Sequence, residues 1–143
     1  MKPVCLVIGA GAGIGGNVAD KFAAEGYHSY LCRRTDQKGL DTLIDNIEKK
    51  GGSASGSLIN AIEDNSLEEL IIDIEKNIGP IEVVVYNLGA QTGMKSLNQT
   101  TQKEFEWGWR IASLGLFRVA KVICPLMETR GKGVILVLSL IHI

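Results

Sequence analysis

Residues 4–16 read VCLVIGAGAGIGG, an apolar run that breaks into closely spaced glycines near the start of the chain. Apolar and β-branched residues without polar alternation are typical of a parallel strand that is covered on both faces. The glycines permit positive φ angles, and their lack of a Cβ lets backbone N–H groups come close to a ligand. Residues 17–25 follow as a predicted helix, whose amino-terminal amides and dipole favour an anion. The stretch therefore predicts a strand, an anion-binding turn and a helix.

The glycines fit two registers. Residues 11–16 match the spacing G-x-G-x-x-G of general dinucleotide-binding turns, but this pattern begins beyond the end of the predicted strand. Gly9, Gly13 and Gly15 form a second pattern, G-x-x-x-G-x-G, which starts directly after Ile8. We favour this second register because it places the turn at the strand end. The alternative interpretation is a glycine-rich strand-to-helix turn that binds no ligand.

The composition is that of one globular domain with no bias toward a charged partner. The 143 residues carry a net charge of -1, from 15 basic and 16 acidic side chains, and contain no strongly basic run. This balance argues against a nucleic-acid partner or an anionic membrane surface. No apolar stretch approaches the length of a membrane span, and the run at residues 4–8 is too short for a secretory signal. We therefore expect a soluble, cytoplasmic protein.

The cysteines agree with this expectation. Cys5, Cys32 and Cys124 are odd in number and lack the spacing of a metal site. We interpret them as buried, reduced thiols, and we predict no metal-binding site.

Strands and helices alternate along the rest of the chain. Further strands are predicted at residues 29–32, 54–59, 81–86 and 134–138. After the second strand, Thr35 or Asp36 is expected to cap a helix with an apolar stripe. Such alternation implies right-handed βαβ units and a parallel sheet.

Two later helices carry distinct signals. Ser66 and Glu69 have the spacing of a capping box in front of an apolar stripe. A longer helical region is predicted from Thr100 or Thr101 to about Arg130, and its middle is apolar on nearly every face. We expect that helix to be buried by the sheet and by a partner subunit.

In this order the elements resemble those of the short-chain dehydrogenase/reductase family. The resemblance rests on the glycine turn, on Arg33 and Arg34 after the second strand, on Asn87 and Gly89 after the fourth, and on the long helix and last strand. It covers essentially the whole chain, but only the amino-terminal part of the family's domain. It implies an α/β fold of the Rossmann type, a doubly wound parallel sheet flanked by helices and incomplete at its carboxyl-terminal side. Residues 1–143 are thus expected to form a single, truncated NAD(P)-binding domain.

The end of the chain carries a separate signal. Residues 138–143 correspond to the translation of a transposase adapter used in sequencing libraries, and we expect them to be a tail that is not native sequence. The natural protein is then expected to continue past Val137.

In the family, the glycine turn carries the pyrophosphate of NAD(P). The resemblance extends this role to Gly9, Ala12, Gly13, Ile14 and Gly15. An acidic residue after the second strand pairs with the ribose 2′-hydroxyl of NAD, whereas arginine accommodates the 2′-phosphate of NADP. Arg33 and Arg34 lie at this position, and a guanidinium grips phosphate through two parallel hydrogen bonds. NADP(H) is therefore favoured, with NAD(H) as the second choice; two solvated arginines are the alternative interpretation.

Residues after the third and fourth strands complete the expected cofactor site. Where the family usually has an aspartate near the adenine, this chain has Asn60, followed by Ala61, and an amide both donates and accepts hydrogen bonds. The family motif Asn-Asn-Ala-Gly is reduced here to YNLG at residues 86–89. Asn87 is expected to tie the strand end to neighbouring backbone, and Gly89 to let the ribose approach. Simple turn residues are the alternative.

The catalytic groups of the family are missing from the sequence. The family uses a tyrosine with a lysine four residues later, a serine and often an asparagine, but no lysine follows at that spacing after Tyr27, Tyr30 or Tyr86. Ala112 stands at the asparagine position. Ser139 lies one residue before the family's serine position. A shift of one residue along a strand turns the side chain to the opposite face of the sheet. We therefore assign no catalytic residue.

The function that the resemblance implies is NADP(H)-dependent oxidoreduction, with hydride transfer between nicotinamide and a small-molecule carbonyl or alcohol. Without the Tyr-x-x-x-Lys segment, the isolated chain is expected to be inactive, and the full-length protein is expected to be a homo-oligomer. The alternative function is a non-catalytic NAD(P)-binding sensor or scaffold. A flavin- or NAD-binding domain of the ordinary dinucleotide type would need an acidic residue in place of Arg33. These residues do not identify the substrate.

Overall fold

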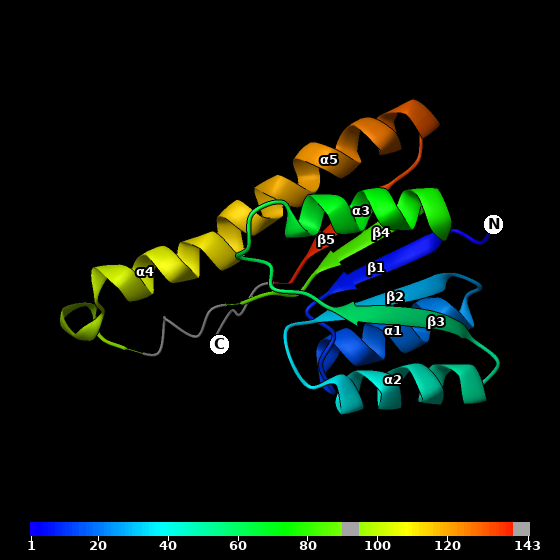
Figure 1. Cartoon of the computed structure of the whole chain (residues 1–143), viewed down its shortest axis with the longest axis horizontal. Helices are drawn as coiled ribbons and strands as arrows, with labels where there is room; N and C mark the ends of the chain where they lie inside the picture. The colour runs from blue at the N-terminus through cyan, green and yellow to red at the C-terminus, as the bar shows by residue number, and fades with distance from the viewer. Residues whose placement is uncertain (90–94, 139–143) are drawn as a thin grey trace.

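Within residues 1–89 and 95–138, which the computed structural model describes, five parallel strands form one sheet with helices on both faces (Figure 1). The strands are β1 (Val4–Ile8), β2 (His28–Arg33), β3 (Ser53–Leu58), β4 (Ile81–Tyr86) and β5 (Val134–Val137). The α-helices are α1 (Ile14–Ala24), α2 (Gln37–Lys49), α3 (Ser66–Asn77), α4 (Gln102–Trp109) and α5 (Gly115–Arg130). The strand order β3-β2-β1-β4-β5 confirms the predicted α/β fold with a doubly wound parallel sheet.

β1 lies at the centre of the sheet. Each of its residues is at most 1% exposed. Leu6 and Ile8 belong to the core beneath α3 and α5, whereas Cys5 and Val7 belong to the core beneath α1 and α2. Because both faces of β1 are covered, every position needs an apolar side chain, which explains the lack of alternation in its sequence.

Two helices begin at residues that the sequence marked as caps. Asp36 precedes α2, and its carboxylate accepts a hydrogen bond of 2.9 Å from the N–H of Gly39. Thr101 precedes α4 and forms a complete capping box with Glu104. These side chains satisfy amides that the first helical turn leaves without partners.

The capping box predicted at Ser66 is wrong. Asn65, with a φ of 64°, precedes α3 and makes no side-chain cap. The Ser66 hydroxyl instead donates to the carbonyl oxygens of Asn60 and Glu63, at 2.9 and 2.8 Å. The serine therefore stabilises the loop between β3 and α3 rather than the amides of the helix.

The long helical region contains a π-helical turn, η3 (Arg110–Leu114), between α4 and α5. Gly115 N–H donates to the carbonyl of Arg110, so the carbonyl of Ile111 is left for another donor. The buried hydroxyl of Tyr86 donates to it. A side chain at position 115 would overlap this hydroxyl, which explains the glycine there. Burial raises the pKa of Tyr86 to about 12, so the hydroxyl keeps its proton.

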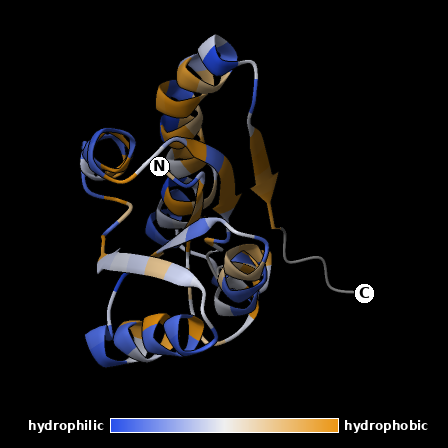
Figure 2. Cartoon of the chain, turned by 90° about the vertical axis from the view of Figure 1, so that its right-hand side faces the viewer, coloured by the Kyte–Doolittle hydropathy of each residue, from blue (hydrophilic) through white to orange (hydrophobic). Residues whose placement is uncertain are grey.

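β5 forms one edge of the sheet, and α5 covers the sheet with one face. Val134, Leu136 and Val137 are 50%, 42% and 52% exposed, and Figure 2 shows β5 as a hydrophobic strand at the outer edge. Val119 is fully buried, whereas Phe117 is 60% exposed. Among the described residues, the sheet therefore buries one face of the long helix, as predicted, and the expected cover of its other faces by a partner subunit stays a prediction.

The cysteines divide by location. Cys5 and Cys32 are buried, free thiols in the sheet, as predicted, and burial raises the pKa of each to about 12. Cys124 is exposed on α5, so its predicted burial is wrong. In the part of the chain that the structure describes, no helix has the length and apolar character needed to span a membrane.

His28 begins β2 and lies against the edge strand β3. Its Nδ1 is 2.7 Å from Ser53 Oγ, and its Nε2 is 2.7 Å from Ser55 Oγ. Burial is the largest cause that lowers the pKa of His28; the charge of Lys2 lowers it further, and that of Glu48 raises it. The folded state therefore disfavours a second proton on this ring.

We expect the free energy of unfolding to fall as the pH is lowered from about 7 to about 5. In this range His28 takes up a proton in the unfolded chain, whereas the folded chain resists protonation, so stability present at higher pH is lost. Urea denaturation at a series of pH values measures the effect. The variant His28→Asn should lose most of this dependence; the same slope in the variant would assign it to other groups.

Candidate functional site

The turn after β1 is held against two neighbouring strands. Gly9 has a φ of 97°, a conformation that favours glycine. Its N–H and that of Ala10 both donate to the carbonyl of Cys32, at 2.9 and 2.8 Å. Asn87 Nδ2 donates to the carbonyl of Gly9 at 3.0 Å, which confirms that Asn87 ties the end of β4 to neighbouring backbone. The carboxyl ends of β1, β2 and β4 therefore meet at this turn.

The glycines of the turn serve two different purposes. A Cβ on Gly9 would overlap the carbonyl oxygen of Asn87, and one on Gly15 would overlap the carbonyl oxygen of Gly9. At Gly11 and Gly13, an added Cβ would meet no atom within 4 Å in residues 1–89 and 95–138. Close packing of backbone explains the glycines at positions 9 and 15, and it favours the register that begins at Gly9. Position 13 faces open space, so packing within the chain does not explain its glycine.

Backbone amides at the start of α1 are available to a ligand. Among the described residues, nothing accepts a hydrogen bond from the N–H groups of Ala12, Gly13, Ile14 or Gly15. Gly13 precedes the helix and has no side chain with which to cap it. Unpaired amides at a helix amino terminus, together with the helix dipole, attract an anion. The turn thus has the donors that a pyrophosphate requires.

A pocket lies beside this turn, at the carboxyl ends of β1, β2 and β3. Its lining includes five of the predicted cofactor residues, namely Gly9, Arg33, Arg34, Asn60 and Ala61. These residues come from three separate parts of the sequence, and the parallel sheet brings them together. The donors of the turn and the cations of the pocket fit a phosphorylated dinucleotide.

Six residues that line the pocket were not predicted: Ile8, Cys32, Ile59, Ile62, Leu88 and Ile111. The first five directly adjoin predicted positions at the ends of the strands, so the strand ends were a usable signal for them. Ile111 lies on the π-helical turn and had no signal of its own, because its place depends on how that turn meets the sheet.

Arg33 is held in place at the end of β2. Its Nη2 lies 3.1 Å from the carboxylate of Asp36, and its side chain is 21% exposed. Gly39 leaves room for this arrangement, since a Cβ there would lie 2.6 Å from Arg33 Nη1. Arg34 follows it and is exposed. Two cations therefore stand at the pocket, and Asp36 offsets part of the charge of the first.

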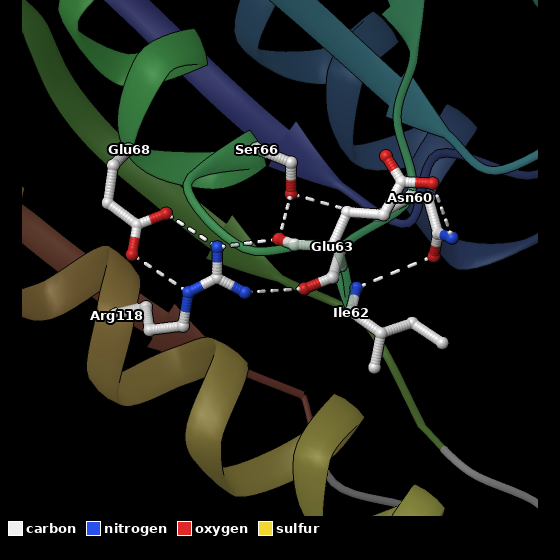
Figure 3. Close-up of polar contacts among 7 residues, drawn as sticks. Asn60, Ile62, Glu63, Ser66, Glu68 and Arg118 are labelled. Atoms are coloured by element: carbon white, nitrogen blue, oxygen red, sulfur yellow. Dashed lines mark hydrogen bonds and ion pairs between the residues drawn. The ribbon is translucent and has the colours of Figure 1, made fainter.

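Asn60 uses its side chain within the loop that follows β3 (Figure 3). Its Nδ2 donates to Glu63 Oε1 at 3.1 Å, and its Oδ1 accepts from the N–H of Ile62 at 3.4 Å. Ala61 is buried beside it. Gly89, predicted to adjoin the ribose, is exposed beyond the end of β4.

Several residues considered for catalysis lie elsewhere. Ala112, at the family's asparagine position, is exposed on η3. Ser139 lies outside the described residues, as does the rest of the predicted tail beyond Leu138. Leu138 itself is described, and its N–H donates to the carbonyl of Tyr86 at 3.1 Å.

The chain is similar to proteins whose names state an activity. It is 26% identical over 134 residues to the 7alpha-hydroxysteroid dehydrogenase of Escherichia coli (strain K12), a match that covers 94% of this chain and 51% of that protein. It resembles the structure of a short-chain dehydrogenase from Sphingobium yanoikuyae in complex with NADPH, with a TM-score of 0.82 and 26% identity over 94% of this chain and 52% of the other. A gluconate 5-dehydrogenase from Burkholderia cenocepacia J2315 in complex with NADP and tartrate gives a TM-score of 0.81 and 25% identity, covering 94% and 52%.

The extent of these matches bears on what they show. The chain spans about half the length of the curated relatives it matches. A family model described as short chain dehydrogenase matches residues 3–141, nearly the whole chain. The sheet order and the glycine turn agree with the expectations drawn above from the sequence motifs. This chain therefore belongs to the short chain dehydrogenase family.

Proposed function

We propose that this chain is the cofactor-binding part of an NADP(H)-dependent oxidoreductase. One observation carries the proposal: the amides of residues 12–15, which have no acceptor within the described part of the chain, belong to the turn beside a pocket lined by Arg33 and Arg34. Two solved relatives that share about a quarter of its residues were determined with NADP or NADPH, which supports the choice of cofactor. When bound, the nicotinamide supplies or accepts a hydride.

Each part of the site has a distinct proposed role. The turn residues Gly9, Ala12, Gly13, Ile14 and Gly15 hold the pyrophosphate. Arg33 and Arg34 bind the 2′-phosphate, so NADP(H) is preferred and NAD(H) binds more weakly. Asn60 and Ala61 contact the adenine, whereas Asn87 and Gly89 shape the turn beside the ribose.

The proposed reaction of the whole protein is hydride transfer between nicotinamide and a small-molecule carbonyl or alcohol. The chain has no Tyr-x-x-x-Lys pair, so we expect the isolated chain to bind NADPH without oxidising it. A fluorescence titration with NADPH tests the binding, and an absorbance assay with a panel of ketones and aldehydes tests turnover. Absence of saturable binding would contradict the cofactor site. Oxidation of NADPH that depends on the carbonyl would contradict the predicted inactivity.

The absence of that catalytic pair also supports a second candidate, a non-catalytic NAD(P)-binding sensor or scaffold. The gene beyond Val137 separates the two candidates, because only the enzyme requires a Tyr-x-x-x-Lys there. We further propose that residues 1–143 form one domain with a tail from residue 138 that is not native. We place the full-length protein in the cytoplasm as a homo-oligomer.

The variant Arg33→Gln should weaken NADPH binding by about tenfold and change NADH binding by less than about twofold, because only NADPH carries the 2′-phosphate. Glutamine removes the cation without placing a second carboxylate beside Asp36. Lys49→Gln is a matched control, since it removes the same charge from the far end of α2. Titration by fluorescence measures both ligands, and equal losses for NADPH and NADH would exclude this role for Arg33.

A further inference from the structure

Arg118 on α5 holds the loop between β3 and α3, although it does not line the pocket (Figure 3). Its Nε and Nη2 donate to the two carboxylate oxygens of Glu68 on α3, at 2.8 and 2.6 Å. Its Nη1 donates to the carbonyl of Ala61 at 3.0 Å, and its Nη2 also donates to the carbonyl of Glu63 at 2.8 Å. One side chain thus joins two helices to the loop that carries Ala61.

The ion pair between Arg118 and Glu68 is partly shielded from solvent, and each partner favours the charged form of the other. The side chains of Arg118 and Glu68 are 14% and 25% exposed. The hydrogen bonds from Arg118 lower the pKa of Glu68, and the carboxylate in turn raises the pKa of Arg118. Glu68 fixes the plane of the guanidinium, which directs its remaining N–H groups to the loop carbonyls. A lysine lacks this planar fork and makes point contacts only.

The bond to Ala61 sets the direction of a peptide in the pocket wall. The carbonyl of Ala61 and the N–H of Ile62 belong to one planar trans peptide and point in opposite directions. Because Arg118 binds the carbonyl, the N–H of Ile62 points away from α5 and donates to Asn60 Oδ1 at 3.4 Å. The guanidinium therefore determines the orientation of the segment that contains both predicted adenine contacts.

We propose that Arg118 is a positioning residue for the adenosine end of the dinucleotide. It acts through Asn60 and Ala61, whose loop it holds at the mouth of the pocket, and it does not touch the ligand. This inference rests on the proposed cofactor site and adds a residue from α5 to it. The adenosine end is then recognised by a loop whose shape depends on the contact between α3 and α5.

The chain contains a matched control for this proposal. Arg130, also on α5, donates to both carboxylate oxygens of Glu75 on α3, at 2.8 and 3.0 Å. It also donates to the carbonyl of Ile81 at 2.8 Å. The chemistry is the same as that of Arg118, but Ile81 begins β4, at the end of the sheet opposite to the pocket. If the Arg118 variants acted only by weakening the packing of α5 on α3, the loss of the Arg130 contacts should reduce ligand binding by the same factor.

The test measures the binding of adenosine 2′,5′-bisphosphate, which has the adenosine end of NADPH and lacks the nicotinamide. Isothermal titration is carried out on the whole chain and on the variants Arg118→Met, Arg118→Lys and Arg130→Met, at a temperature where circular dichroism shows each to be folded. We expect binding to weaken about tenfold in Arg118→Met and at least about threefold in Arg118→Lys. Arg130→Met should change it by less than about twofold, although its melting temperature falls.

Each outcome has a definite meaning. Wild-type affinity in both Arg118 variants, or an equal loss in Arg130→Met, would overturn the positioning role. If Arg118→Met does not fold, the result for Arg118→Lys decides, because lysine keeps the positive charge beside Glu68. If the wild-type chain binds neither adenosine 2′,5′-bisphosphate nor NADPH, the proposed function fails, and the positioning role fails with it. That failure is recognised before any variant is measured.

Discussion

Gly13→Val is expected to abolish measurable binding of both NADPH and NADH while leaving the folded chain intact. An added Cβ at position 13 meets no atom of the described residues within 4 Å, so this part of the fold has room for it. The same space lies beside the unpaired amides of Ala12, Ile14 and Gly15, where we place the pyrophosphate. The loss of two charge-assisted hydrogen bonds to the pyrophosphate should lower the affinity by a factor of about 100 or more.

Fluorescence titration with each dinucleotide measures this loss, and thermal unfolding measures the integrity of the fold. Gly11→Val is a useful companion variant. An added Cβ at position 11 also meets none of the described atoms within 4 Å, but this position precedes the amides of residues 12–15. It should reduce binding less than Gly13→Val. Unchanged affinity in Gly13→Val would show that the turn has a structural role only.

Gly9→Ala is expected to lower the free energy of unfolding by about 2–5 kcal/mol. Two effects combine at this position. The φ of 97° is unfavourable for any residue with a Cβ, and that Cβ would overlap the carbonyl oxygen of Asn87. Because the turn joins β1 to β2 and β4, relief of the overlap would have to move strands of the central sheet.

Gly26→Ala separates the two effects. Gly26 has a similar φ of 92°, but an added Cβ there meets nothing within 4 Å. The variant Gly26→Ala should therefore lower the free energy of unfolding only by the cost of the positive φ, about 1–2 kcal/mol. Urea denaturation of both variants gives the two free energies, and an equal cost in both would mean that the backbone at Asn87 gives way without penalty.

Local sequence was sufficient for the elements that surround the turn. The strand predicted at residues 81–86 has the same bounds as β4. The apolar runs at residues 4–8 in β1 and 83–86 in β4 could be read directly, because strand segments buried on both faces have few polar positions. The start of α1 was placed too late, at residue 17 instead of Ile14. Gly15 and Gly16 are poor helix formers that the close packing of the turn retains inside the helix.

Several residues of the candidate cofactor site were named in advance. The family resemblance pointed to Arg33, Asn60 and Ala61, and they line one pocket because residues at the carboxyl ends of parallel strands meet at one edge of the sheet. Neither the resemblance nor the strand pattern predicted the ion pair between Arg33 and Asp36, in which the carboxylate offsets part of the positive charge. Whether the arginine favours NADP(H) therefore depends on a contact that the strand pattern does not reveal.

By itself, then, the sequence determined the parallel sheet, the glycine turn at Gly9 and the family. Tertiary structure alone decided the hydrogen-bond partners of Ser66, Ile111 and Arg118. Ser66 has the spacing of a helix cap and donates to a loop, and Arg118 lies on a helix and binds a carbonyl 57 residues away. Helical periodicity shows which face of a helix is buried, but the partner of each polar group depends on how α3, α5 and the sheet pack together.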